Sequence, residues 1–531
     1  MKQTLNAALD AVRTRQPDAP AFWYEGNTIT WNEFDARIGR VAAGFRKLGI
    51  GQGDVVSLWL PNTPAWLVCF FALARIGAIA LATNTRFRSG ELKDILYRSG
   101  TKAVVYWPGY RGIDFVHVLH QVVEDLPALK HLVLYTEQDD EPAGSHAGFP
   151  QQLTEYASLE ATEPGDQGGD AATPDTPCLL FTTSGTTSRP KLVVHVQHTI
   201  PPFALDVARE FGQGEHGART LQVVPFCGTY GFVQTVSAMF SGTPMALHHS
   251  FDAAESARLI RQYGVTLMGA TDEMIRRLYA HETPPIPFPG IKLICGSRAP
   301  ELAGLSRERG FHLISAYGSS EVQALFSRRP DSDEPEQRAV GGGVPVSLGR
   351  GAAVRVRDQE TGQLMDKRGQ GEVEIKGPSV FSHYLNDPEA TRKAFTEDGW
   401  FRTGDLGFMD EADNSWTFLT RIGDALRLSG FLVNPMEIET YVREHAGVDL
   451  CYVVGVDHQS RTTVVAFYTS ASGAPVDEAA LREHCTERMA RYKVPARFVH
   501  VKEFPMIASM NTSKLDRKLL RERALALLIA S

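Results

Sequence analysis

The 531-residue sequence lacks the features of several protein classes. It has only six cysteines, which are scattered and form no Cys-x-x-Cys pair, so neither a disulfide framework nor a zinc site is expected. Positive charge is not in excess, because the formal net charge is -8. That balance argues against a nucleic-acid partner or an anionic membrane surface. The remaining class that fits is an enzyme with reduced thiols.

Long apolar runs are also missing. The nearest one, Trp66–Ala82, contains Arg75 and Gly77 and is short for a membrane span, so we expect a buried helix that leads into a strand. The first residues, Met1–Asp10, are mixed and polar and have no apolar core of a signal peptide. We therefore predict a cytoplasmic protein without an integral membrane segment.

The composition that is present is that of a globular protein, with 43% hydrophobic and 22% charged residues. The length suggests two or more domains. Apolar strand patterns alternate with helical ones, which predicts a largely parallel, doubly wound sheet. The expected strands are Val55–Leu60, Ala78–Leu81, Ala103–Tyr106, Leu221–Val224, Met245–Leu247, Val265–Met268 and Lys292–Cys295. The expected helices are 30–49, which begins with a Thr30–Glu33 capping box, and Ala65–Ile76, Glu91–Arg98, Ala253–Tyr263 and Glu273–Ala280.

The pattern changes in three places. Residues 143–176 are rich in Gly, Pro, Asp and Thr, and we expect a loop there. Val354–Arg357 and Glu372–Lys376 alternate with period two between Gly-rich turns, which predicts a small antiparallel sheet or barrel. After Arg421 a module of about a hundred residues, a common size for a small domain, has αβ character. Its expected elements are Glu437–His445, Cys451–Val456, Val464–Tyr468, Glu478–Arg491 and a closing helix from about Leu515.

A run of hydroxyls and glycine, Thr182–Lys191, is the most informative stretch. Apolar residues on both sides predict a loop between two buried strands. Backbone N–H groups and hydroxyls in such a loop can hold a polyphosphate, and Lys191 adds a positive charge. The spacing is not that of a Walker A loop. An ordinary surface loop rich in Ser, Thr and Gly is the alternative.

Five segments in order carry a resemblance to a known family. They are the hydroxyl-rich loop, Tyr317–Glu321, Trp400–Asp405, Arg421–Glu439 and Ser513–Arg517. With them, nearly the whole chain resembles the adenylate-forming superfamily, which includes acyl-CoA synthetases, adenylation domains and firefly luciferase. The resemblance implies an α/β fold with a large N-terminal domain of doubly wound sheets, a small β-barrel-like subdomain and a small, mobile α+β C-terminal domain. The implied boundaries are 1–421, a hinge at 422–424 around Gly423, and 425–531.

The resemblance also implies roles for these residues. Such enzymes join a carboxylate to the α-phosphate of ATP, release pyrophosphate and pass the acyl group to a thiol. ATP, Mg²⁺ and CoA are therefore the implied cofactors. Glu321 would hold Mg²⁺, Tyr317 would pack on adenine, Ser320 would meet the α-phosphate, and Lys514 would act as the catalytic cation. The implied ATP-binding residues are Thr183, Ser184, Gly185, Thr186, Thr187, Lys191, Ala316, Tyr317, Gly318, Ser320, and, for the ribose, Asp405 and Arg421.

The acyl site, the hinge and the lysine motif differ from the family pattern. The expected acyl-pocket residues are Phe226, Gly228, Tyr230, Phe232 and Met268, and Gly228 stands where members often have histidine. Gly423 replaces the usual Asp or Lys of the hinge, and Ser513 replaces the glycine before the lysine. Arg298 stands near the adenine site, where smaller residues are common. The expected CoA contacts are Ser429, Gly430, Phe431 and Lys493.

Apolar walls favour a fatty, branched or aromatic acid over a strongly polar one. An acyl-CoA synthetase is the leading hypothesis, and a possible homodimer is part of it. A stand-alone enzyme that loads a separate carrier protein is the alternative. A third hypothesis is a silent acyl-adenylate or nucleotide binder, which the retention of Glu321, Asp405 and Lys514 disfavours.

Overall fold

The computed structural model describes residues 2–137, 148–165, 171–183, 190–281, 291–296, 301–428, 431–458, 461–508 and 513–529. By compactness the chain divides into two units. The first comprises Met1–Val354 and Ile375–Phe401, and the second comprises Arg355–Glu374 and Arg402–Ser531. Among the described residues, no helix is long and apolar enough to cross a membrane.

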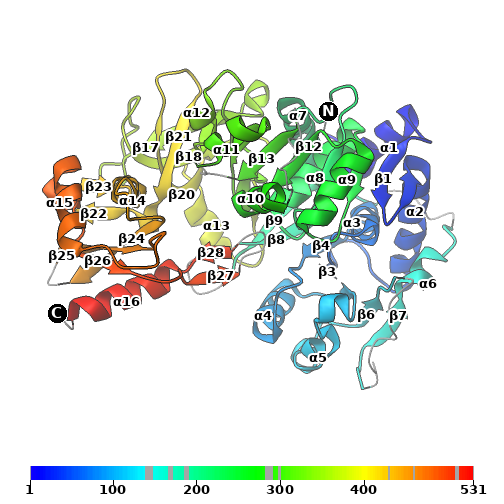
Figure 1. The fold of residues 1–531 in the computed structure, drawn as a ribbon. Coiled ribbons are helices and arrows are strands. Elements are labelled where there is room, and N and C mark those ends of the chain that lie inside the picture. Colours follow the sequence, from blue (N-terminus) through cyan, green and yellow to red (C-terminus); the bar gives the residue numbers. More distant parts are fainter. Residues whose placement is uncertain are drawn as a thin grey trace. The chain divides into compact units, whose positions relative to one another are not determined.

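An eight-stranded sheet forms one layer of the first unit (Figure 1). Its strand order is β19-β9-β8-β4-β3-β5-β6-β7, and its central strands are parallel, whereas β8 and β9 are antiparallel. The strands are β3 (Val55–Trp59), β4 (Ile79–Ala82), β5 (Ala103–Tyr106), β6 (His131–Leu134), β7 (Gln152–Glu155), β8 (Pro177–Thr182), β9 (Leu192–Val196) and β19 (His383–Tyr384).

Burial on both faces explains the apolar runs in this sheet. All five residues of β3 are buried, and only Arg75 of α3 (Pro64–Ile76) is less than fully buried. Thr63 caps α3 and Pro64 occupies its first turn, where a missing N–H costs nothing. The run Trp66–Ala82 is therefore a core helix followed by β4, as predicted.

A second group of strands in the first unit follows the order β16-β15-β14-β13-β12-β10-β11-β1-β2. The strands from β1 to β14 pair in parallel, apart from the β1–β2 hairpin. They are β1 (Pro20–Tyr24), β2 (Asn27–Thr30), β10 (Thr220–Gln222), β11 (Met245–Leu247), β12 (Leu267–Ala270), β13 (Lys292–Gly296), β14 (His312–Tyr317), β15 (Ser327–Arg328) and β16 (Gly342–Pro345). The parallel, doubly wound prediction is confirmed.

Helices flank both sheets of this unit (Figure 1). They are α1 (Leu5–Arg15), α2 (Trp31–Lys47), α4 (Ser89–Ser99), α5 (Phe115–His120), α6 (Tyr156–Glu160), α7 (Ile200–Phe211), α8 (Thr229–Ser241), α9 (Ala253–Tyr263), α10 (Asp272–His281), α11 (Glu301–Arg309), α12 (Pro335–Arg338) and α13 (Pro388–Ala394). The Thr30 capping box is present, because Glu33 N donates to Thr30 Oγ1 (3.2 Å) and Thr30 N donates to a Glu33 carboxylate oxygen (2.8 Å).

Two local predictions were wrong. The expected loop at 143–176 includes β7 and α6, because Tyr156 and Leu159 are buried, and Leu159 packs directly against Gly44 of α2. The strand expected at Val265 begins instead at Leu267. Val265 N donates to Ile260 O (3.0 Å), so Val265 closes the end of α9 rather than extending the strand.

The second unit contains a small sheet and a C-terminal αβ module. Neighbouring strands β17 (Ala353–Arg357), β18 (Gly371–Lys376), β20 (Phe401–Met409) and β21 (Trp416–Arg421) correspond to the predicted small sheet. Five residues at the ends of these strands, Ala353, Val354, Ile375, Lys376 and Phe401, belong to the first unit. The module consists of β22 (Leu426–Leu428), β23 (Phe431–Val433), α14 (Pro435–Arg443), β24 (Cys451–His458), β25 (Arg461–Tyr468), α15 (Glu478–Arg488), β26 (Arg497–His500), β27 (Met506–Ala508), β28 (Ser513–Leu515) and α16 (Arg517–Ile529).

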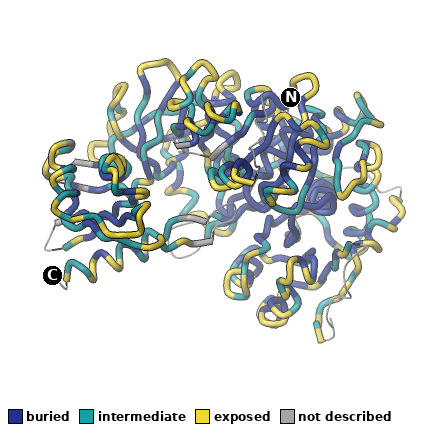
Figure 2. The backbone as a smooth tube through the Cα atoms, in the orientation of Figure 1, coloured by how far each residue is buried: buried dark blue, intermediate teal, exposed yellow. Residues whose placement is uncertain are grey.

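Each unit has its own core. Figure 2 shows buried backbone concentrated along the strands of the first unit and in a smaller set of strands of the second. In the module, side chains of β22, α14, β24, β25 and α15 form one apolar cluster, and Leu520 and Ala524 of α16 cover the opposite face of the β24–β25 pair. The cores position the polar loops at the strand ends, where the predicted site residues lie.

Candidate active site

The β8–β9 hairpin fixes both ends of the hydroxyl-rich loop. Thr183 N donates to Lys191 O (3.0 Å), and Lys191 N donates to Thr183 Oγ1 (3.0 Å). These reciprocal bonds close the neck of the loop, so the strands flanking it are as predicted. Ser184, Gly185, Thr186 and Thr187 lie outside the described residues.

One side chain joins the lysine of this loop to the predicted metal carboxylate. The Lys191 ammonium lies 4.4 Å from the centroid of the Tyr384 ring, and the Tyr384 hydroxyl donates to Glu321 Oε1 (3.0 Å). Glu321 stands in a single 3₁₀ turn, Ser320–Val322, and its carbonyl accepts from Phe381 N (2.7 Å). The structure thus brings Lys191 and Glu321 to one place through Tyr384, which the sequence analysis did not single out.

The turn after β14 requires its glycine. Ala316 and Tyr317 end the strand and are buried. A Cβ on Gly318 would lie 1.2 Å from the carbonyl oxygen of Ala324, because the chain folds back tightly and Gln323 and Ala324 have positive φ (56° and 57°). The tight turn places Ser320 and Glu321 in the 3₁₀ turn that follows the buried end of β14.

Ser320 is held from two sides. His195 of β9 donates from Nε2 to Ser320 O (2.8 Å), and Thr229 donates to Ser320 Oγ (3.2 Å). Burial lowers the pKa of His195 from 6.5 to about 4, so the imidazole is neutral near pH 7. Neither residue could be named from the sequence, because neither belongs to a motif that places it beside Ser320.

The predicted acyl segment is aromatic and largely buried. The Phe226 and Phe232 rings pack on Trp66 (centroids 5.3 Å and 6.3 Å apart). The Tyr230 hydroxyl donates to Ile294 O (2.6 Å) and accepts from Ala270 N (3.1 Å). Gly228 caps α8 with φ -101°, and Met268 belongs to the core cluster under the second sheet.

Two further residues border this segment. Asn62, which the sequence analysis missed, accepts from Phe226 N (2.8 Å) and donates to Val224 O (3.0 Å), so it fixes the backbone before the aromatic run. Cys227 is 4% exposed, and burial raises the pKa of its thiol to about 12. Arg298, whose role the sequence left open, lies outside the described residues.

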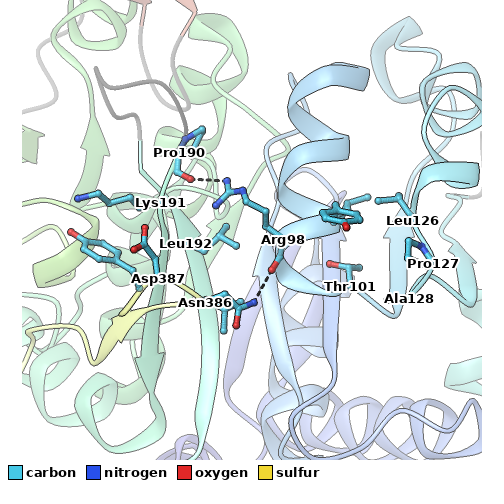
Figure 3. Close-up of a pocket in the computed structure, with 14 residues that line it drawn as sticks. Arg98, Thr101, Leu126, Pro127, Ala128, Pro190, Lys191, Leu192, Asn386 and Asp387 are labelled. Atoms are coloured by element: carbon cyan, nitrogen blue, oxygen red, sulfur yellow. Dashed lines mark hydrogen bonds between the residues drawn. The ribbon is translucent and has the colours of Figure 1, made fainter. Parts of the chain in front are cut away.

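A cavity of about 600 Å³ opens beside Lys191. Figure 3 shows Lys191 and Asp387 on one side of it and Leu126, Pro127 and Ala128 on the other. Arg98 of α4 donates to Pro190 O (2.7 Å), and Asn386 donates to Arg98 O (2.9 Å). Arg98 therefore anchors the end of the hydroxyl-rich loop, a contact between segments too distant in sequence for any pattern to indicate.

In the second unit, the two residues expected to hold the ribose, Asp405 and Arg421, pair with each other. Asp405 and Arg421 are cross-strand partners on β20 and β21, and Arg421 Nε lies 3.0 Å from Asp405 Oδ1. The Asp405 side chain is 2% exposed, whereas that of Arg421 is 53% exposed. Arg421 Nη1 also donates to Thr403 O (3.0 Å), so the cation is aligned with a buried carboxylate.

The hinge and thiol-site residues are placed only in part. Gly423 stands in a 3₁₀ turn, Ile422–Asp424, and Arg521 of α16 donates to its carbonyl oxygen (3.1 Å) and to Asp424 (2.7 Å). Lys493 forms an ion pair with Glu437 (2.6 Å). Phe431 lies in β23 and Lys514 in β28, while Ser429 and Gly430 lie outside the described residues.

The residues present fit a magnesium nucleotide. Glu321 offers a hard carboxylate oxygen, and no three His, Cys, Asp or Glu residues gather as metal ligands in the part of the chain that the structure describes. Mg²⁺ commonly binds through one or two carboxylates, with phosphate oxygens and water completing its octahedron. The Glu321 carboxylate, linked through Tyr384 to Lys191 at the neck of the hydroxyl-rich loop, is a donor of this kind.

Comparison with known proteins identifies the family. The family described as AMP-binding enzyme matches residues 9–385, and its C-terminal domain matches residues 437–511. The chain belongs to this family. A sulfoacetate–CoA ligase of Cupriavidus necator is 30% identical over 520 residues, which cover 96% of each chain. A CoA ligase of Mycobacterium tuberculosis, named for a methyl-dioxo-octahydroindenyl propanoyl group, is 28% identical and covers 96% of this chain and 98% of its own.

Solved structures confirm the fold of this AMP-binding enzyme. ATP-bound MatB from Rhodopseudomonas palustris superposes with a TM-score of 0.83 at 24% identity, covering 98% of this chain and 99% of its own. The α/β fold with a large N-terminal and a small C-terminal domain is therefore as predicted. The protein is an AMP-forming acid–thiol ligase that uses ATP, Mg²⁺ and CoA.

Proposed function

We propose that this enzyme activates an apolar carboxylic acid, fatty, branched or aromatic, and transfers its acyl group to CoA. The proposed type of acid is supported by the packing of the aromatic rings of Phe226 and Phe232 on Trp66. The segment Pro225–Phe232 contains no charged residue that could pair with a second anionic group of a substrate. The named acids of the relatives range from sulfoacetate to a bicyclic propanoate, so the acid class rests on these side chains.

In the first half-reaction a carboxylate oxygen attacks the α-phosphorus, and the bond to the β-phosphate breaks to release pyrophosphate. Thr183 and Lys191, at the neck of the loop, would hold the β- and γ-phosphates with Ser184, Gly185, Thr186 and Thr187. Mg²⁺, when held by Glu321, would neutralise charge on the phosphates. Ser320, fixed by His195, would donate to the α-phosphate, and Lys514 would stabilise the charge that develops there.

In the second half-reaction the CoA sulfur forms the thioester bond with the acyl carbon, and AMP leaves. The Asp405–Arg421 pair would hold the ribose of AMP through both steps. We propose that 1–421 forms the nucleotide and acid domain, that 422–424 is the hinge, and that 425–531 rotates to bring Lys514 and then Ser429–Phe431 to the same bond. Lys493, paired with Glu437, would lie near CoA.

A panel of acids tests the substrate class. Octanoate, isovalerate and benzoate should give faster AMP release than sulfoacetate or malonate, with Glu321→Gln as the inactive control. A preference for sulfoacetate or malonate would overturn the apolar assignment. It would leave the ligase chemistry untouched.

The acceptor is tested separately. Free CoA should be consumed stoichiometrically with AMP formation. A phosphopantetheinylated carrier protein supplied in its place should not be acylated faster. The reverse order would favour the alternative, an enzyme that loads a separate carrier.

Two further properties belong to this proposal. The five cysteines whose side chains the structure describes are buried and form no disulfide with one another, which supports a reducing compartment such as the cytoplasm. Light scattering on the purified chain tests whether it forms a homodimer.

A further inference from the structure

We propose that Tyr384 is a positioning residue that keeps the phosphate-binding lysine and the metal-binding carboxylate on separate sides of one side chain. The proposal rests on the roles assigned to Lys191 and Glu321 above. Two contacts support the proposal. The ring of Tyr384 faces the Lys191 ammonium (4.4 Å to the centroid), and the Tyr384 hydroxyl donates to Glu321 Oε1 (3.0 Å).

The backbone holds Tyr384 from three directions. Tyr384 pairs with Val193 of β9, two residues after Lys191, and Leu385 N donates to Leu192 O (2.8 Å). Tyr384 N donates to Thr391 Oγ1 of α13 (3.0 Å). The side chain is 3% exposed and packs on Phe381 (centroids 4.6 Å apart). A side chain fixed in this way can set the position of two others.

The two contacts suit opposite charges. The face of an aromatic ring attracts an ammonium without neutralising it, and a hydroxyl donates a strong bond to a carboxylate. Lysine and glutamate in direct contact would form an ion pair, which ATP and Mg²⁺ would have to break. With Tyr384 between them, the ammonium stays available for phosphate and the carboxylate for the metal.

Two substitutions separate the two contacts. Tyr384→Phe removes only the hydroxyl, and Tyr384→Leu removes the hydroxyl and the ring. The measured quantity is the dissociation constant of α,β-methylene-ATP, determined by calorimetry over a series of Mg²⁺ concentrations. This probe cannot transfer AMP to an acid, because the bridge between its α- and β-phosphorus is not cleaved. Equilibrium binding of this probe reports on the ground state and not on turnover.

Mg²⁺ is expected to tighten binding of the probe, and Tyr384→Phe should raise the Mg²⁺ concentration at which half of this effect is reached by about tenfold. Loss of a hydrogen-bond partner behind a metal ligand commonly has an effect of this size. Binding without Mg²⁺ should change by less than about twofold, because the ring still faces Lys191. Tyr384→Leu should show the same shift in Mg²⁺ dependence and, in addition, bind the probe about fivefold more weakly without Mg²⁺.

Three controls make the outcome decisive. Tyr468→Phe removes another buried tyrosine hydroxyl, bonded to Val476 in the second unit, and should leave both quantities unchanged. In a Glu321→Gln background, Tyr384→Phe should have no further effect on the Mg²⁺ dependence. Thermal unfolding of each variant checks that the fold is retained, and Tyr384→Phe carries the test if the leucine variant does not fold.

The failures are distinguishable. If Glu321→Gln and Lys191→Ala change neither quantity, the assigned roles of these residues are wrong and the proposal falls with them. If both variants weaken Mg²⁺ or phosphate binding while Tyr384→Phe behaves like Tyr468→Phe, the roles stand and Tyr384 has only a packing role. A Mg²⁺ shift for Tyr384→Phe that persists in full in the Glu321→Gln background would also overturn the proposal.

Discussion

His195 illustrates how a single buried residue at the site links fold and pH. Its imidazole is fully buried, donates to Ser320 O, and has a pKa of about 4 in place of 6.5. In the unfolded chain the same imidazole protonates first as the pH falls. The contribution of His195 to the free energy of unfolding therefore falls as the pH drops from about 6.5 to 4. Above pH 7 this contribution is fully present.

We predict that the wild-type protein loses about 3 kcal/mol of unfolding free energy between pH 7 and pH 4 through this residue alone, because burial lowers its pKa from 6.5 to about 4. His195→Gln, whose amide can still donate to Ser320 O, should show a shallower dependence over that range. Urea unfolding at a series of pH values measures the difference. Parallel curves for the two proteins would mean that His195 titrates normally.

Gly318 is the second residue at which a substitution should have a large effect. Gly318→Ala would place a Cβ 1.2 Å from the Ala324 carbonyl oxygen, so the turn behind Glu321 must open. We expect a loss of about 3 kcal/mol or more in unfolding free energy, together with weaker ATP binding. Gly304→Ala in α11, where a Cβ meets nothing within 4 Å, is the matched control and should be neutral or slightly stabilising.

Gly228 concerns the substrate. With no side chain there, the proposed acyl site can extend past a point that a histidine would block. Gly228→His should lower kcat/KM for bulky acids more than for acetate or propionate, by about 1–3 kcal/mol. Rates measured over an acid series decide this, and equal losses for all acids would show that Gly228 does not line the site.

Single site residues could be predicted from the sequence only where they belong to a short motif. Lys191 and Glu321 could be named because they stand in short motifs, and the Asp405–Arg421 pair followed with them. Tyr384, His195 and Asn62 could not be named. Their contacts depend on the pairing of β19 with β9 and on the packing of segments more than a hundred residues apart, which no local pattern encodes.

Among the elements, the 3₁₀ turn Ile422–Asp424 is the most consequential. Gly423 has no positive φ, a Cβ on it meets nothing within 4 Å, and Ala425 N donates to Arg421 O (3.0 Å) across the turn. Alanine should therefore fit, whereas proline would disfavour the helical conformation of Ile422 before it.

We expect Gly423→Ala to leave both half-reactions within about twofold, since the turn accepts a Cβ. Gly423→Pro should spare ATP–pyrophosphate exchange but slow thioester formation at least tenfold, on the order of the effects seen when a hinge is altered. Single-turnover kinetics of each half-reaction provide the measurement. Equal slowing of both steps by proline would remove the hinge assignment from this turn.

Helices and strands were predicted correctly where every residue of the element is buried. They were missed where the burial depends on contacts with segments distant in sequence. Core strands such as β3, β5 and β11 were placed within a residue, because their apolar runs have no other explanation. Helix α6 was missed because its composition resembles a loop. Its apolar residues are buried by segments distant in sequence: Leu159 packs against Gly44 of α2, and Tyr156 packs on Tyr135. Val265, apolar like a strand residue, instead terminates α9.

For the molecule as a whole, the proposed mechanism assigns two reactions to one site. Lys514 serves only the first of them, so Lys514→Ala should reduce adenylation by several kcal/mol. Thioester formation from supplied acyl-adenylate should stay nearly intact. Rapid-quench measurement of each step checks this, and parallel loss of both steps with the fold retained would contradict domain rotation.

The buried thiols have a consequence for self-inactivation. An acyl-adenylate is a potent acylating agent, and a cysteine thiolate beside it would capture the acyl group as a dead-end thioester. Cys227 stands between two residues of the proposed acyl site, yet with a pKa of about 12 only about one thiol in 10⁵ is ionised at pH 7. Cys69, Cys178, Cys451 and Cys485 are likewise buried. We therefore expect the acyl group to pass to the thiol that arrives from solution rather than to Cys227.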